Sequence, residues 1–156
     1  RGGTENVPAI LGFGVAAKEA MAWLTQENIS TMESQRDSFE SAVLSKLPHA
    51  HINSSGAQRA WTTSSISIPS VKGELILLML SERNVCASSG SACSSGSIKE
   101  SKVIKAIGMP DDGEWGTLRF SFARTTTQSE LNEAVEALCC SLATISDVLE
   151  TSSPAT

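Results

Sequence analysis

The stretch TLRFSFARTTTQSE, residues 117–130, decides the fold because it places an alternating strand directly before a capped helix. In its first seven residues Leu118 and Phe120 share one face of the expected strand, and Arg119 lies on the other. Four residues beginning at Thr127, Thr-Gln-Ser-Glu, form a capping box, in which two side chains satisfy backbone N–H groups at the helix start. The sequence therefore predicts a half-buried strand over these seven residues, followed by a helix that packs on its apolar face.

Hydrophobic periodicity predicts further elements outward from this stretch. Helices are expected over 6–25, 30–47, 71–80 and 101–107, and strands over 62–68 and 85–87. Helices followed by a small mixed unit indicate an α+β fold. The expected organisation is connecting helices over 1–48, a compact α+β domain over 49–150, and a frayed tail over 151–156.

Composition excludes several classes of function. The chain has 156 residues, 40% of them hydrophobic and 19% charged, which suits one domain with a core. Its net charge is −5 and no basic run is present, so binding to nucleic acid or to anionic membranes has no support. No apolar stretch is long enough to span a bilayer. Because the first residue is not Met, we expect a fragment or a processed product.

The four cysteines show no disulfide framework and no Cys-x-x-Cys spacing, so we expect free thiols in a reducing compartment and no metal site. His49 and His51 do not lie at a zinc-finger distance from a cysteine pair, and we assign them no chemistry. Cys86 falls in an expected strand and is predicted to lie in the core. Cys139 and Cys140 flank the apolar stripe of the last helix and are predicted to pack there.

Cys93 is the candidate nucleophile. It lies in the segment SSGSACSSGS, residues 88–97, which contains no large apolar side chain and is expected to be a mobile loop. A catalytic thiol must be reachable as a thiolate, and small neighbours leave it uncovered. Composition alone leaves open whether this cysteine is functional or accidental.

Arg119 and Thr4 are candidate binding residues. The Arg119 guanidinium could hold a substrate carboxylate by two parallel hydrogen bonds, or could be a solvated strand arginine. Thr4 follows two glycines and precedes a helix, where its hydroxyl could bind a phosphate or cap the helix. Arg124 is expected to be a surface residue or an ion-pair partner. The residues alone decide neither the Arg119 nor the Thr4 alternative.

Three segments in this order resemble the cysteine desulfurases of the NifS/IscS type, within the class V aminotransferase family. Residues 1–8, RGGTENVP, continued by the Gly-Phe-Gly at 12–14, are similar to the family's Arg-(Ser/Gly)-Gly-Thr segment. The segment at 88–97 resembles the family's active-site cysteine loop in its long form. The Leu-Arg-Phe-Ser at 118–121, followed by Arg-Thr-Thr at 124–126, resembles the family's substrate-arginine strand.

The resemblance implies the small carboxy-terminal domain of a fold type I, pyridoxal-phosphate (PLP)-dependent transferase, with connecting helices from the large domain. It implies that Cys93 takes sulfur from L-cysteine as a persulfide, leaving L-alanine, and passes it to an iron–sulfur scaffold or another acceptor protein. Arg119 would bind the substrate carboxylate. Thr4 would bind the cofactor phosphate in the site of the partner subunit of a homodimer. The compartment would be the cytoplasm or an organellar matrix.

The sequence also departs from the family pattern. The family's cofactor lysine, its neighbouring His, and the Asp that holds the pyridine nitrogen lie upstream of the segment that Arg1 begins, so this chain alone is expected not to turn over cysteine. Ile-Lys-Glu at 98–100 replaces the more usual Leu-Glu-Pro. Two alternatives stay open: a non-catalytic sulfur-relay or interaction module with the same fold, and a related transaminase or lyase.

Overall fold

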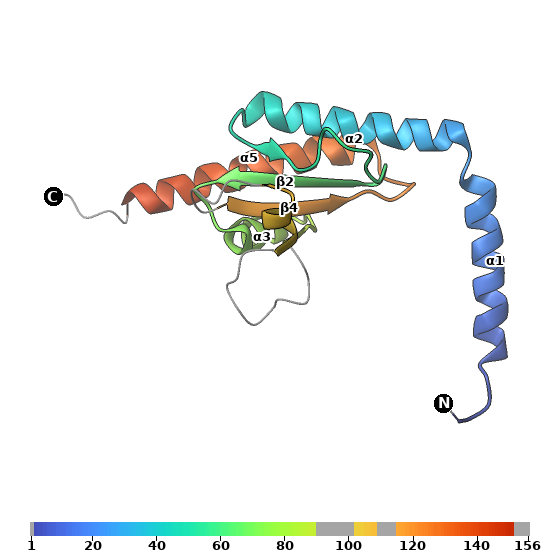
Figure 1. Ribbon diagram of the computed structural model, residues 1–156. Coiled ribbons are helices and arrows are strands. Elements are labelled where there is room, and N and C mark those ends of the chain that lie inside the picture. Colours follow the sequence, from blue (N-terminus) through green and yellow to red (C-terminus); the bar gives the residue numbers. More distant parts are fainter. Residues whose placement is uncertain (1, 90–101, 109–114, 152–156) are drawn as a thin grey trace.

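The computed structural model describes residues 2–89, 102–108 and 115–151 (Figure 1). The elements, in chain order, are α1 (Val7–Trp23), α2 (Gln26–Lys46), β1 (His51–Ile52), β2 (Thr63–Pro69), α3 (Gly73–Ser81), β3 (Ser88–Ser89), α4 (Lys102–Ala106), β4 (Trp115–Ser121) and α5 (Gln128–Thr151). In Figure 1 α5 runs behind the strands, and α1 projects away from this unit.

The strands form a four-stranded antiparallel sheet with the order β1-β2-β4-β3. Its central pair is β2 with β4, in register from Thr63 opposite Ser121 to Pro69 opposite Trp115. Both central strands were predicted from their alternation, and each is confirmed within about two residues. The mixed fold of helices and a small sheet is therefore as expected, and the antiparallel pairing is a finding of the structure.

Alternation gives the sheet two unlike faces. The inner face carries Ile66, Leu118 and Phe120, all buried. Helices α2, α3 and α5 pack their apolar side chains into the same core. Phe39 of α2 lies 5.1 Å, ring centroid to ring centroid, from Phe120. Burying such side chains contributes about 1.5–3 kcal/mol each, so this face is the main source of stability.

The start of α5 follows the predicted capping box. Thr127 Oγ1 accepts a hydrogen bond from the Glu130 backbone N–H at 3.3 Å, and the Thr127 backbone N–H donates to Glu130 Oε2 at 2.7 Å. These bonds satisfy donors that a helix end leaves unpaired. Along the helix the predicted stripe faces the core up to Ile145, whereas Leu149 is exposed.

Helix α2 is part of the compact unit, because its apolar side chains lie in the core. Met32, Phe39 and Val43 are buried against the sheet, and Phe39 is only 1% exposed. Buried polar contacts add to this packing: Arg59 donates two bonds to the Glu40 carboxylate, at 2.7 and 2.9 Å, and Ser64 donates to Glu40 at 2.7 Å. Helix α2 thus shares the core of the sheet. The division of the chain into residues 1–48 and 49–150 stays a prediction.

Helix α1 forms where predicted but buries none of its residues. Asn6 caps it by accepting a bond from the Ala9 N–H at 3.1 Å, and a proline lies in its first turn. Its exposed apolar side chains include Val7, Ile10, Leu11, Phe13, Val15 and Met21. Within the described residues no single helix is long and apolar enough to cross a bilayer; α1 and α2, bent by 79°, pass that test only as a pair, by length and composition.

Three smaller expectations differ from the structure. The strand predicted over 85–87 lies instead at Ser88–Ser89, because the Val85 N–H donates to Leu80 O at 3.0 Å and this segment closes the end of α3. The first two residues of the expected loop are therefore a strand, and the remainder, 90–97, lies outside the described residues. Helix α3 was predicted as mostly buried, yet Leu78 is exposed.

Candidate functional site

The outer face of the sheet, opposite the helices, carries a row of polar residues at one register. Ser65 of β2 and Ser88 of β3 both lie directly opposite Arg119 of β4. Asn53, just after β1, extends the row because its N–H donates to Ser65 O at 2.8 Å. Directly paired residues point to the same face of a sheet. We call Asn53, Ser65, Arg119 and Ser88 the outer row.

Side-chain hydrogen bonds fix half of this face. Asn53 Nδ2 lies 3.0 Å from Ser65 Oγ and 2.9 Å from Ser67 Oγ, and donates to both. Ser67 Oγ also lies 2.9 Å from Thr117 Oγ1. Asn53 is 4% exposed and Ser67 is fully buried, so the bonds between these two side chains are shielded from water. Such a network holds its members in one arrangement.

Arg119 lies exposed on the outer face, as its position in the alternating strand predicted. None of the ion pairs between described residues involves it. A guanidinium presents donors in a planar fork that matches a carboxylate. Among the described residues, the structure thus places a guanidinium without an ion-pair partner in the middle of a row of hydroxyl and amide groups.

Cys93 lies outside the described residues, but the strand that leads to it is placed. Ser88 and Ser89 pair with Arg119 and Leu118, and Cys93 follows Ser89 by four residues. A fully extended chain covers at most about 14 Å over that separation. The main chain of the cysteine segment therefore starts directly beside Arg119.

Thr4 is exposed and is not brought near the outer row. It precedes α1, whose far end carries the N-terminus away from the sheet in Figure 1. The cap of α1 is Asn6, so the capping alternative for Thr4 is excluded. The two predicted binding residues of this chain do not share one site within a single copy of it.

The other cysteines differ in burial. Cys86 is exposed, which corrects the prediction of a core residue, because the strand begins two residues later. Cys139 packs against the core as predicted, and burial raises the pKa of its thiol. Cys140 is exposed, so the packing predicted for it is wrong. Among the described residues no cluster of three His, Cys, Asp or Glu side chains could hold a metal.

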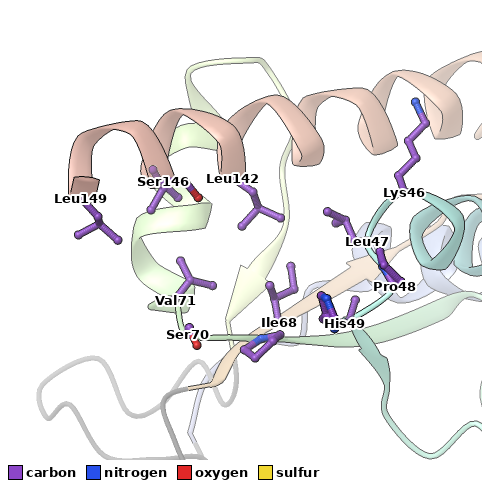
Figure 2. Close-up of a pocket in the computed structure, with 13 residues that line it drawn as sticks. Lys46, Leu47, Pro48, His49, Ile68, Ser70, Val71, Leu142, Ser146 and Leu149 are labelled. Carbon is purple, nitrogen blue, oxygen red and sulfur yellow. The ribbon is translucent and has the colours of Figure 1, made fainter. Parts of the chain in front are cut away.

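A cavity of about 370 Å³ lies at a second place, between α5 and the segments that flank β1 and β2 (Figure 2). Its wall is mostly apolar and includes Leu47, Ile68, Val71, Leu142, Ile145 and Leu149. His49 lines it, while Lys46 bonds to Glu136 of α5, which raises the Lys46 pKa. The cavity contains none of the predicted site residues.

Sequence reasoning missed Asn53 and the buried Glu40–Arg59 pair. The serines at 65 and 67 were recognised only as the polar half of an alternating strand. Nothing near position 53 in the sequence indicates a partner, because the contacts of Asn53 reach residues 12 and 14 positions further on. Arg124 is exposed, in line with a surface role.

Known proteins with similar sequences identify the family of this chain. Residues 1–134 match the class-V aminotransferase family. The chain is 39% identical over 135 residues to cysteine desulfurase NifS of Azotobacter vinelandii, covering 86% of this chain and 33% of the relative. It is also 39% identical over 138 residues to a cysteine desulfurase of Trichormus azollae, covering 88% and 34%.

The solved structure of a NifS-like protein from Rickettsia africae ESF-5 has the same fold, with a TM-score of 0.76 at 28% identity over 92% of this chain and 36% of that chain. The chain spans about a third of the length of these relatives. The predicted resemblance is confirmed, since the family match covers most of the residues: the chain belongs to the class-V aminotransferase family.

Proposed function

We propose that this chain is the carboxy-terminal part of a cysteine desulfurase, which converts L-cysteine to L-alanine and carries the sulfur as a persulfide on Cys93. The observation that carries the proposal is the placement of Arg119 on the open face of the sheet, directly beside the strand that leads to the cysteine segment. The 39% identity to proteins named cysteine desulfurases supports the same activity.

Arg119 is proposed to hold the carboxylate of L-cysteine. Its side chain is exposed on the outer face, and a bidentate guanidinium–carboxylate contact fixes orientation as well as position. Fixing the substrate in this way converts the attack of a thiol on its sulfur into an effectively unimolecular step.

Cys93 is proposed as the nucleophile. Its thiolate attacks the sulfur of the substrate, a sulfur–sulfur bond forms, and the carbon–sulfur bond of the substrate breaks. The released electron pair stays with the carbon skeleton, which leaves as alanine after protonation. The short tether from Ser89 keeps the thiol within reach of a substrate held by Arg119.

The cofactor is proposed to be PLP, which when bound supplies the electron sink for breaking the carbon–sulfur bond. Thr4 fits the phosphate through its exposed hydroxyl. The first turn of α1 offers little beyond that hydroxyl, because the Val7 N–H donates to Glu5 O, Pro8 has no N–H, and the Ala9 N–H is bound by Asn6. The lysine that anchors PLP is proposed to lie outside residues 1–156.

The proposed assembly is a homodimer in which Thr4 serves the site of the other subunit. The distance supports this: α1 has 17 residues and is about 25 Å long, and it carries Thr4 away from its own Arg119. The proposed sulfur acceptor is an iron–sulfur scaffold or another carrier protein. The free thiols at Cys86, Cys139 and Cys140 favour a reducing compartment, such as the cytoplasm or an organellar matrix.

The test uses the full-length polypeptide that contains this chain, purified with PLP, with alanine and sulfide measured after addition of L-cysteine. Cys93→Ser is expected to abolish sulfur transfer to an acceptor. Cys86→Ser is the matched control, because it removes an exposed thiol from the same segment of chain and is expected to keep full activity.

Normal sulfur transfer by Cys93→Ser would overturn the proposal. Persulfide formation on Cys93 from another sulfur donor, with no alanine produced from L-cysteine, would favour the non-catalytic relay instead. Amino transfer to a keto acid faster than sulfur release would favour a transaminase.

A further inference from the structure

Ser65 is the neighbour of Arg119 on the outer face, and its side chain is held in place. The two residues are directly opposite each other on β2 and β4, which puts their Cβ atoms about 4.5–5.5 Å apart. Ser65 is half-buried and Arg119 is exposed, so both reach the same open side of the sheet. When the long Arg119 side chain folds over β2, a carboxylate bound by its guanidinium comes within reach of the Ser65 hydroxyl.

Asn53 determines in which direction the Ser65 hydroxyl can donate its proton. The Asn53 side-chain amide donates to Ser65 Oγ at 3.0 Å, and the Asn53 backbone N–H donates to Ser65 O at 2.8 Å. A hydroxyl has one proton to donate and two lone pairs that accept. Because Ser65 Oγ accepts from Asn53, its own proton is directed away from the amide and stays available for an acceptor.

The rest of the network explains why Asn53 can hold this position. Asn53 is 4% exposed, and its side-chain amide also bonds to Ser67, which bonds to Thr117. Moving the amide would leave buried polar groups without hydrogen-bond partners, which is unfavourable. Asn53 is therefore a rigid support for Ser65, anchored from the edge of the sheet.

We infer that Ser65 is a second carboxylate-binding residue, which donates its hydroxyl proton to the carboxylate held by Arg119, and that Asn53 is the positioning residue for Ser65. This inference rests on the proposed function and adds to it a specificity element. A carboxylate has two oxygens with several acceptor sites, so a guanidinium and a hydroxyl can bind it together. The row thereby selects an α-amino acid over an amine that lacks the carboxylate.

The test measures the KM and kcat of the full-length, PLP-containing protein with L-cysteine and with L-cysteine methyl ester, which lacks the charged carboxylate. Ser65→Ala is expected to raise KM for L-cysteine about tenfold, equivalent to about 1.4 kcal/mol, with kcat within about twofold. The KM for the ester is expected to stay unchanged. Ser65→Thr keeps a hydroxyl and is expected to restore KM to within about threefold of the parent value.

Two further variants separate positioning from general damage. Asn53→Ala is expected to raise KM for L-cysteine by a smaller factor, about threefold to fivefold, because the Ser65 hydroxyl remains but is no longer aligned. Ser121→Ala is the matched control. Ser121 is exposed on β4, the strand of Arg119, but it lies opposite Thr63, so the KM for L-cysteine is expected not to change.

Equal effects of Ser65→Ala on L-cysteine and on the ester would overturn the inference, and so would an equal effect of Ser121→Ala. Arg119→Ala in the same assay distinguishes this failure from failure of the proposed function. If Arg119→Ala raises KM for L-cysteine at least tenfold and Ser65→Ala does not raise it, only the role of Ser65 fails. If the parent protein releases no sulfur from L-cysteine, both proposals fail.

Discussion

The two faces of the small sheet are built from the same strands and have opposite chemistry. On the inner face Leu118 and Phe120 of β4 lie against Ile66 of β2 and three helices. On the outer face, one residue along, Arg119 lies between two serines. The pleat of a strand separates these neighbours completely, because successive side chains point to opposite sides.

This difference separates stability from binding. The inner face excludes water and contributes burial, so its residues tolerate little change in volume. The outer face carries polar groups that are either locked in the Asn53 network or exposed, as Arg119 is. The comparison predicts that substitutions at adjacent positions of β4 act on different properties: one changes the free energy of unfolding and the other changes substrate binding.

The largest expected effect is that of Leu118→Ala, on the inner face. Leu118 is 0% exposed, and removing its side chain is expected to lower the free energy of unfolding by about 2–5 kcal/mol. Arg119→Ala, the adjacent control, is expected to change it by no more than about 0.5 kcal/mol. Urea unfolding followed by far-ultraviolet circular dichroism measures both. Comparable destabilisation by the two variants would contradict the separation of the faces.

Gly116→Ala probes how closely the inner face of β4 approaches α3. A Cβ atom at Gly116 would lie 2.7 Å from Val71 O and 3.0 Å from the Gly73 N, which are backbone atoms. The expected loss is about 1–3 kcal/mol in the free energy of unfolding. Gly56→Ala is the control, since a Cβ there meets no atom within 4 Å. A stable Gly116→Ala variant would show that the strand and helix separate easily.

Helix α5 also has a buried side and an exposed side, and two adjacent cysteines lie on different sides. Cys139 packs against the core, and burial raises its pKa, whereas Cys140 is exposed. Because the thiolate is the reactive form, iodoacetamide near pH 8 is expected to label Cys139 several-fold more slowly than Cys140. Mass spectrometry of peptides from the Cys139→Ser and Cys140→Ser variants would resolve the two rates. Equal rates would mean that this part of α5 does not stay packed.

The smallest expected effect concerns the start of α5, the helix that covers the inner face. The Thr127 backbone N–H and hydroxyl lower the pKa of Glu130 below its ordinary value of 4.5. The unfolded chain then binds the proton more readily, so this contribution is present above about pH 4.5 and is lost as pH falls through the folded-state pKa. Glu130→Gln is expected to flatten the dependence of the unfolding free energy on pH below about pH 4.5. Parallel curves for parent and variant would contradict the capping contact.

Sequence patterns predicted the parts of the fold that depend on local spacing. The alternation around Arg119 placed β4 and its two faces, and the Thr127 capping box placed the start of α5. Cys86 was wrongly assigned to the core because three consecutive apolar residues suggested a strand, whereas pairing with β4 selects Ser88 and Ser89. Strand boundaries depend on the partner strand, which a local pattern does not contain.

The candidate site shows the same limit. Arg119, Thr4 and Cys93 were identified from motifs, and the exposure of Arg119 followed from strand periodicity. The hydrogen bonds from Asn53 to Ser65 and Ser67 could not be predicted in this way, because they depend on the register of β1 against β2. Register is a property of the assembled sheet.

The sequence by itself determined which residues of β2 and β4 face the core, where the last helix begins, and which family the motifs resemble, because periodicity and capping act over a few neighbouring residues. Only the tertiary structure decided that α2 joins the core, that Thr4 lies away from Arg119, and that Asn53, Ser65, Arg119 and Ser88 form one row. The reason is that these facts depend on contacts between segments far apart in the chain, which form only when the strands pair.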